Sequence, residues 1–259
     1  MQRFANGWLS QRDLRAGAPA RAQPRLFCLP HAGSGAAAFY RWKRELAAVD
    51  VCPVLLPGRE MRLAERSMDD AVALVDALTV ATAPYLDVPY AIFGHSMGAL
   101  LAYAWALRIQ ERQLRAPVCL FVSGRNAAHL PFGHRDLHRL DDAAFVAELR
   151  RRYGGMPVDF MAEADLRALF LPILRADLRL VETYRHGAEA LLNCPVMAFA
   201  GEDDPSVSDA GLVGWGELTR GEFAVLRCDG DHFYHVGAGQ SALLTAIAAR
   251  IVPASPSSR

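Results

Sequence analysis

The sequence has almost no lysine and no excess of either charge. Lys43 is the only lysine among 259 residues, so arginine supplies nearly all of the positive charge. Lysine plus arginine and aspartate plus glutamate both total 28, which gives a formal net charge of zero. Nucleic acids and anionic membranes are usually bound through a basic excess. We therefore expect neither as a partner.

Long apolar runs and paired cysteine motifs are also missing. The longest apolar stretch, residues 71–84, is interrupted by Asp76 and is shorter than the roughly 20 residues of a membrane span. The first 25 residues carry several arginines and no apolar block, so we expect no secretory signal and a cytoplasmic protein. The five cysteines form no Cys-x-x-Cys pair. We expect buried free thiols rather than a zinc or redox site.

Short apolar runs alternate with helical patterns along the chain. Such runs suit strands that are buried on both faces of a parallel sheet. We expect strands at residues 25–29, 51–56, 90–93, 118–123, 196–200 and 223–227. We expect helices near residues 36–48, 69–83, 97–112, 207–219 and 240–251. This alternation predicts an α/β fold with a mostly parallel, doubly wound sheet, and we expect residues 1–259 to form one domain.

The alternation stops between Arg125 and Cys194, where no buried strand run occurs. Helix-like segments occupy residues 142–152, 162–170 and 174–186 instead. This stretch is too long for an ordinary crossover between neighbouring strands. We expect residues 126–193 to be a helical lid insertion over one end of the sheet. A separate small helical domain is the alternative.

The residues Gly94-His95-Ser96-Met97-Gly98 fit the pattern G-x-S-x-G between an expected strand and an expected helix. This is the context of a nucleophile elbow, in which a tight turn exposes the serine at a helix N-terminus. Side chains at the two flanking positions would collide, which accounts for Gly94 and Gly98. We predict that Ser96 is a nucleophile, the alternative being a serine in an ordinary strand–helix turn.

A nucleophilic serine needs a base that takes its proton. In a chain of this fold the base is a histidine that follows the acid in sequence. His232 lies just after the last expected strand and is the best candidate, because Gly230 allows the loop to turn back over the elbow. His235, three residues further on, is the rival. We expect His95 to point away from the site and to be structural.

The acid should lie on the loop after the expected strand 196–200, where it would hold the histidine in the correct tautomer. Glu202, Asp203 and Asp204 compete for this role. We favour Asp204 because of its spacing from Gly201 and Val207. Asp203 is the alternative, and otherwise it is an exposed turn residue or a helix cap.

An oxyanion hole needs two backbone N–H donors. The first is the N–H of Met97, the residue after the nucleophile. The second comes from the loop after the first expected strand, Pro30-His31-Ala32-Gly33-Ser34-Gly35. Small residues let this backbone approach a reacting carbonyl. We assign the Ala32 N–H as the second donor, with His31 or Gly33 as alternatives.

With these residues in place, the chain resembles the type II thioesterases, the free-standing editing hydrolases of polyketide and nonribosomal peptide synthases. Matching segments follow in order at Leu26–Gly35, Leu56–Arg62, Gly94–Ala99, Ser123–Arg125, Tyr153–Pro157, Leu174–Tyr184 and Gly230–Phe233. The resemblance implies the α/β-hydrolase fold with a mobile lid. It also implies a triad of Ser96, Asp204 and His232, with Ala32 and Met97 as oxyanion donors. Thioesterases embedded in such synthases typically carry the acid one strand earlier, where this chain has Val122–Arg125 and no carboxylate.

The resemblance further implies hydrolysis of acyl thioesters on the phosphopantetheine arm of carrier proteins, which removes aberrant acyl groups. No cofactor or metal is expected. We expect acyl or peptidyl carrier proteins as transient partners and a monomeric enzyme. Residues of the basic set Arg125, Arg150, Arg151 and Arg152 are candidates for contact with an acidic carrier, unless they are simply solvated. The alternatives are product release, a medium-chain fatty acyl-carrier-protein thioesterase, a general serine esterase, or a binding protein with a dead site.

Overall fold

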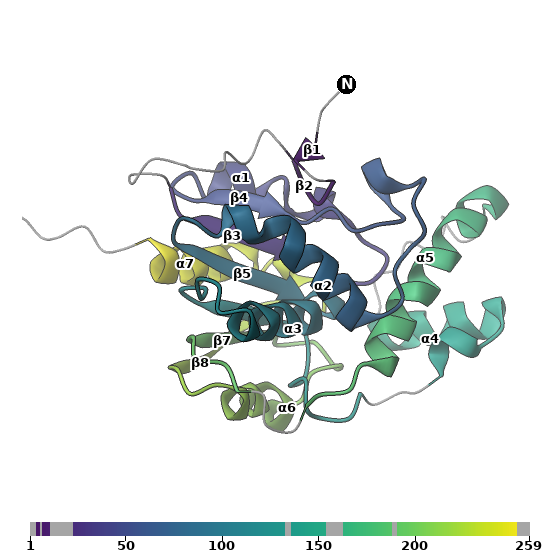
Figure 1. The fold of residues 1–259 in the computed structure, drawn as a ribbon. Coiled ribbons are helices and arrows are strands. Elements are labelled where there is room, and N and C mark those ends of the chain that lie inside the picture. The colour runs from purple at the N-terminus through teal and green to yellow at the C-terminus, as the bar shows by residue number, and fades with distance from the viewer. Residues whose placement is uncertain are drawn as a thin grey trace, which may run out of the picture.

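Six parallel strands form the central sheet of the computed structural model, in the order β4-β3-β5-β6-β7-β8 (Figure 1). The structure describes residues 4–5, 7–10, 23–132, 136–153, 163–187 and 191–252. The strands are β3 (Arg25–Leu29), β4 (Asp50–Pro53), β5 (Tyr90–His95), β6 (Leu120–Ser123), β7 (Val196–Gly201) and β8 (Phe223–Cys228). Two short strands, β1 (Phe4–Ala5) and β2 (Leu9–Ser10), pair antiparallel beside it. All six expected strands of the sheet are present, with ends shifted by up to three residues.

Helices cover both faces of this sheet, as the alternation predicts. They are α1 (Trp42–Glu45), α2 (Ala71–Thr82), α3 (Met97–Glu111), α6 (Asp209–Val213) and α7 (Gln240–Ile251). Figure 1 shows α2 and α3 in front of the strands and α7 behind them. Neighbouring residues of β3 alternate between the two resulting cores. Phe27 and Leu29 join the core under α2 and α3, whereas Leu26 and Cys28 join the core under α1 and α7.

Short 3-10 turns connect or extend these elements. They are η1 (Ala36–Phe39), η2 (Glu60–Arg62), η3 (Ala83–Tyr85), η4 (Leu137–Arg139), η6 (Gly214–Leu218) and η7 (Tyr234–Val236). Two expected helices are wrong in detail, because residues 36–48 divide into η1 and α1, and residues 207–219 divide into α6 and η6. In η1 the Glu60 carboxylate accepts the N–H groups of Ala36 and Ala37 at 2.9 Å each. Such a tertiary contact leaves no periodic signal in the sequence.

The stretch between β6 and β7 contains η4, α4 (Asp142–Tyr153) and α5 (Ala164–Thr183). Figure 1 shows α4 and α5 together at one end of the molecule. These elements share a small apolar core formed by Leu137, Phe145, Leu149, Leu171, Leu174 and Leu178. Glu182, near the end of α5, accepts the Leu137 N–H at 2.9 Å and so holds η4 in place. The motif residues Gly154–Pro157 lie outside the described residues.

Helix α5 corrects the expected break between residues 170 and 174. It runs through Pro172, although proline removes one helical hydrogen bond and disfavours a helix interior. Leu171 and Leu174, on either side of the proline, are buried against the rest of the insertion. Burial of these side chains offsets the cost of the proline, so tertiary packing overrides the local preference.

The five cysteines are all buried and none forms a disulfide, as expected from their sequence context. No helix in the described ranges combines the length and apolarity that crossing a membrane requires.

Candidate active site

Ser96 occupies a strained turn between β5 and α3. Its backbone angles are φ 55° and ψ −110°, a region that residues other than glycine rarely adopt. The Ser96 N–H donates to the Ser123 carbonyl of β6 at 2.8 Å, which ties the turn to the neighbouring strand. Its side chain lies at the N-terminus of α3 and is partly exposed. This is the backbone geometry of a nucleophile elbow.

Both glycines of the motif are required by close backbone approach. A Cβ on Gly94 would lie 1.9 Å from the Gly98 carbonyl oxygen. A Cβ on Gly98 would lie 2.1 Å from the carbonyl oxygen of Leu29 and 2.8 Å from that of Pro30. The second contact also shows that the loop after β3 passes directly beside the elbow. The structure therefore brings the two expected oxyanion segments together.

Asp204 and His232 meet on the loops that follow β7 and β8. His232 Nδ1 lies 2.7 Å from Asp204 Oδ2, and both side chains are at least 96% buried. Glu202 and Asp203 are exposed. Of the three candidate acids, Asp204 is the one that contacts the imidazole. Its catalytic role remains a prediction, and this contact is the geometry that the prediction requires.

Ser206 is a site residue to which the sequence alone gave no role. Its N–H and its hydroxyl both donate to Asp204 Oδ1, at 2.9 and 2.6 Å. Its hydroxyl also lies 3.1 Å from His232 Nδ1. An aspartate that accepts the N–H two residues ahead is a common turn motif, so the order Asp-Pro-Ser was a usable signal.

The pKa of Asp204 lies below its usual value. Burial alone would raise it, but the hydrogen bond and the charge of His232 lower it, and the two bonds from Ser206 lower it further. Asp204 is therefore a carboxylate at neutral pH. A carboxylate beside Nδ1 keeps the proton on that nitrogen and stabilises an imidazolium.

Three further histidines pack behind His232. The ring of His95 lies 4.9 Å from that of His232 and stacks on that of His235 at 3.8 Å, measured between centroids. His31 contacts both His95 and His235, edge to face. Burial lowers the pKa of all three, to about 4 for His31. They are therefore uncharged at neutral pH.

His95 and His235 are both fully buried. His95 Nδ1 lies 2.8 Å from the Ser123 hydroxyl, in agreement with the structural role expected for it. The ring nitrogens of His235 are buried and have no hydrogen-bond partner within the described parts of the chain. His232 therefore fits the expected base better than its rival His235 does.

The expected oxyanion donors stand at the elbow and on the loop that crosses it. Met97 is the first residue of α3, and the first N–H groups of a helix have no partner inside that helix. Ala32 lies on the loop between β3 and η1. The next N–H, that of Gly33, donates to Asp177 Oδ2 at 2.8 Å. That bond occupies Gly33, one of the two alternatives, and leaves Ala32 as the better assignment.

Ser96 opens into a cavity of about 360 Å³. Ser206 lines the same cavity. Ser96 and the residue that donates hydrogen bonds to Asp204 therefore face a single cavity. Arg151 and Arg152 reach it from α4 of the insertion.

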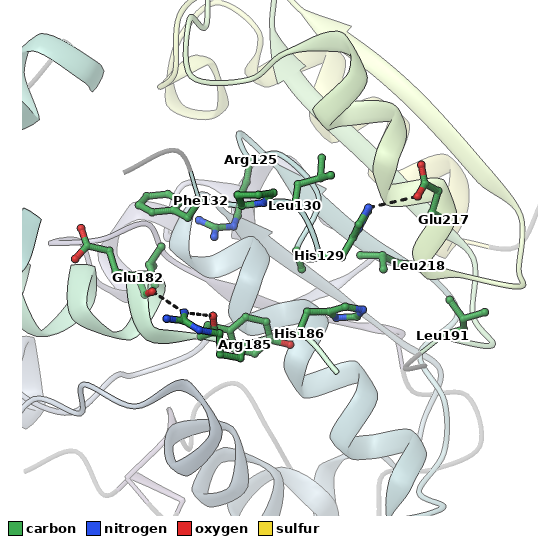
Figure 2. A pocket seen from close by; sticks show the side chains of 14 residues that line it. Arg125, His129, Leu130, Phe132, Glu182, Arg185, His186, Leu191, Glu217 and Leu218 are labelled. Atoms are coloured by element: carbon green, nitrogen blue, oxygen red, sulfur yellow. Dashed lines mark hydrogen bonds and ion pairs between the residues drawn. The ribbon is translucent and has the colours of Figure 1, made fainter. Parts of the chain in front are cut away.

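A second cavity of about 580 Å³ adjoins the first and shares four wall residues with it, Arg125, Leu130, Pro131 and Phe132. Figure 2 shows its mixed lining, with Phe132 and Leu130 near Arg125, and His129 paired with Glu217. The guanidinium of Arg125 lies over the Phe132 ring, 4.9 Å from its centroid. Arg125 therefore stands between the two cavities rather than on an open surface. Within the described ranges no three His, Cys, Asp or Glu side chains are grouped to hold a metal ion.

Comparison with known proteins gives consistent matches over most of the chain. Residues 24–251 match the thioesterase domain family. The chain is 39% identical over 214 residues to the gramicidin S biosynthesis protein GrsT of Aneurinibacillus migulanus, which covers 82% of this chain and 83% of GrsT. It is similar in structure to the type II thioesterase BorB of the borrelidin biosynthetic cluster. The TM-score is 0.82 at 33% identity, over 96% of this chain and 100% of BorB.

A second solved structure is similar to the same extent. It is YbtT, the type II thioesterase of the yersiniabactin NRPS/PKS biosynthetic pathway, with a TM-score of 0.80 at 30% identity. The match covers 90% of this chain and 96% of YbtT.

Proposed function

The chain belongs to the thioesterase family, and from this premise we propose that it hydrolyses acyl thioesters held on the phosphopantetheine arm of carrier proteins. The carrier proteins belong to a polyketide or nonribosomal peptide synthase, as in the pathways of its relatives. The enzyme clears short or wrongly processed acyl groups that stall the synthase. The observation that carries this proposal is Ser96 on a strained elbow, in one cavity with the Ser206 that bonds Asp204.

Ser96 acts as the nucleophile and His232 as the base. The Ser96 hydroxyl proton passes to His232 Nε2 while Oγ bonds to the thioester carbon. The carbonyl oxygen becomes an oxyanion, which the N–H groups of Ala32 and Met97 stabilise. When the oxyanion collapses, the carbon–sulfur bond breaks, and the sulfur takes the proton from His232. An acyl ester of Ser96 remains.

Water completes the cycle. It gives a proton to His232 as it attacks the acyl ester, and a second oxyanion forms against the same two N–H groups. Collapse releases the carboxylic acid and returns the proton to Ser96. Throughout, Asp204 holds the proton on His232 Nδ1 and stabilises the transient imidazolium. No metal or cofactor takes part in this sequence.

The two adjoining cavities offer space on either side of the thioester. We propose that the acyl group extends from Ser96 past Arg125 and Phe132 into the larger cavity (Figure 2). The mixed polar and apolar lining of that cavity suits a range of short acyl chains better than one long alkyl chain. This agrees with an editing enzyme that accepts many substrates.

Residues 126–193 act as the lid in this proposal. Its helices α4 and α5 share a small core of their own, and α4 supplies Arg151 and Arg152 to the cavity of Ser96. Movement of the insertion would therefore change access to the nucleophile. We expect the chain to be a single domain and a monomer. We also expect it to act in the cytoplasm, a reducing compartment in which its buried free thiols would persist.

The carrier protein docks transiently near the mouth of this cavity. Arg150 and Arg151 of α4 are exposed, and Arg151 lines the cavity of Ser96, so they are better placed for an acidic partner than Arg125, which lies over Phe132. Glu148 pairs with Arg151 and Arg152 at 3.0 and 2.8 Å, and so neutralises part of this charge. The contact is therefore expected to be weak and salt-dependent.

The test presents one acyl group in three forms, on a holo carrier protein, on free pantetheine and as an oxygen ester. A kcat/KM that is highest on the carrier protein supports the editing function. Equal values for all three would overturn it in favour of a general serine esterase. A preference for medium-chain acyl groups on a fatty-acid carrier would instead favour the medium-chain alternative.

A further inference from the structure

Arg59 and Asp177 form a buried ion pair between two segments that carry no assigned role in the reaction. Arg59 follows β4 in the segment Leu56–Arg62, and Asp177 lies on α5 of the insertion. The guanidinium donates two parallel hydrogen bonds to the carboxylate, at 2.8 and 2.6 Å. The exposed fractions are 6% for Arg59 and 1% for Asp177. Such a two-point contact fixes orientation as well as distance.

The same pair forms hydrogen bonds with the loop that contains Ala32. Asp177 Oδ2 accepts the Gly33 N–H at 2.8 Å, and Arg59 Nη1 donates to the Ser34 carbonyl at 3.0 Å. Two consecutive residues of the loop are thus held, one through its N–H and one through its carbonyl. The residue just before them is Ala32. The backbone that follows Ala32 is therefore held in part by Asp177, on a helix far away in the chain.

The pair is arranged so that its charge does not oppose catalysis. A lone carboxylate one residue from the oxyanion site would disfavour the negative charge that develops there. Arg59 compensates this charge with a bidentate contact, and a buried carboxylate without that partner would be strongly unfavourable. Packing supports the contact, because a Cβ on Gly33 would lie 2.5 Å from Leu174 of α5. Gly33 also has a φ of 77°, a conformation that favours glycine, so a side chain at this position would be strained as well as close to Leu174.

We propose that Arg59 and Asp177 are positioning residues for the oxyanion hole, which aim the Ala32 N–H when α5 is docked on the loop. The inference rests on the proposed function, since it assumes that Ala32 stabilises the oxyanion of a thioester. Neither residue touches the substrate. Their effect passes through Gly33 and Ser34, so the position of the insertion and the competence of the oxyanion hole are coupled.

The test compares Arg59→Met, Arg59→Lys, Asp177→Asn and the double variant Arg59→Met/Asp177→Asn with the wild type. Two rates are measured, kcat and KM on an acyl pantetheine, and the second-order rate at which a fluorophosphonate labels Ser96. We expect Arg59→Met to lower kcat by about 100-fold at nearly constant KM, since small misplacement of a catalytic group costs this much. Labelling should slow in parallel. Lysine restores the charge but not the two-point contact, so Arg59→Lys should recover part of the loss.

The double variant distinguishes two explanations for a loss of activity. In one, the charge pair positions the loop; in the other, the two side chains only fill space. It removes the uncompensated carboxylate that Arg59→Met leaves behind, while the asparagine oxygen can still accept the Gly33 N–H. We expect its kcat to exceed that of Arg59→Met. If the two side chains only fill space, the double variant should have the lowest kcat of the four variants. That result would overturn the proposal.

Arg25→Met is the matched control. Arg25 is 2% exposed, pairs with Asp87, and is the first residue of β3, at the end of the strand away from the loop. Its loss should lower thermal stability but leave kcat of the folded enzyme unchanged. An equal fall of kcat in Arg25→Met and Arg59→Met would overturn the proposal, as would unchanged kcat in folded Asp177→Asn and Arg59→Lys. A wild type that is labelled by the fluorophosphonate but hydrolyses no thioester would count against the proposed function alone.

Discussion

The Ser206 hydroxyl donates a hydrogen bond of 2.6 Å to Oδ1 of Asp204, whereas His232 Nδ1 lies 2.7 Å from Oδ2 of the same carboxylate. Each carboxylate oxygen therefore has its own partner, and the plane of the acid is fixed. The arrangement makes Ser206 a support for the acid rather than a second nucleophile. Its contribution can be measured separately from that of Asp204.

Ser206→Ala should lower both the stability of the protein and its kcat. A hydrogen bond to a charged group contributes about 1.5–3 kcal/mol, and the backbone N–H of residue 206 remains to hold Asp204. We expect kcat to fall about tenfold, which corresponds to about 1.4 kcal/mol of transition-state stabilisation. Ser208→Ala is the matched control, because Ser208 caps α6 through Gly211 and does not touch the acid. If both variants lose the same activity, Ser206 acts only through folding.

Ser96→Ala should abolish catalysis without unfolding the protein. Removal of a triad serine leaves only the oxyanion hole and binding, so we expect kcat to fall by roughly 10⁴–10⁶-fold. Fluorophosphonate labelling should disappear as well. The exposed Ser241 of α7 provides the control, since Ser241→Ala should label normally. A loss of activity below about tenfold would mean that Ser96 is not the nucleophile.

The choice between two adjacent acids can be tested with one pair of variants. Asp204→Asn removes the charge that holds His232, so kcat should fall by roughly 10⁴-fold, as when a triad aspartate is made neutral. Asp203→Asn changes an exposed side chain and should leave kcat near that of the wild type. The two kcat values at neutral pH decide the question. Small and equal losses would contradict the assignment of Asp204.

The sheet and the elbow could be read from the sequence because their signals are local. Continuous apolar runs give the strands, and Gly94 and Gly98 are dictated by backbone contacts within and beside one turn. The pairing of Asp204 with His232 was accessible through the order of residues along this fold. Each of these features involves only a few residues. These residues are either close together in the chain or located at the ends of neighbouring strands.

Contacts between distant segments left no such signal. The Arg59–Asp177 pair spans 118 positions, and neither residue's neighbours indicate the other. The helix α5 continues through Pro172 because of leucines that pack on α4 and η4, whereas local preference indicates a break. The cluster of His31, His95 and His235 likewise forms only when the ends of β3, β5 and β8 come together.

The insertion should open more readily than the sheet. Its core consists of a few side chains, and residues 163–169 at the start of α5 are exposed. Amide hydrogens in α4 and in the first half of α5 should therefore exchange faster than those of β5 and β6. The second half of α5, which carries Asp177, should be better protected than the first. The helix α7 serves as the control for a helix packed on the sheet. Exchange as slow in α4 as in β5 would contradict a mobile lid.

Stability should fall as the pH drops from about 6.5 toward 4, because His31, His95 and His235 stay uncharged in the folded protein. Unfolded histidine binds a proton near pH 6.5, whereas burial lowers the pKa of His31 to about 4 in the fold. Between these values the unfolded state holds more protons, so acid favours unfolding. His31 alone would account for roughly 3 kcal/mol at the acid end of this range. The decline should begin well above the pH at which carboxylates titrate.

His235→Leu tests this origin of the acid sensitivity. Burial lowers the pKa of His235, and both of its ring nitrogens lack a hydrogen-bond partner in the described structure, so leucine of similar volume removes the titration without breaking a bond. Urea unfolding at a series of pH values should show a shallower loss of unfolding free energy between pH 6.5 and 4 than in the wild type. Loss of stability with the same pH dependence in both proteins would mean that His235 does not stay neutral in the fold.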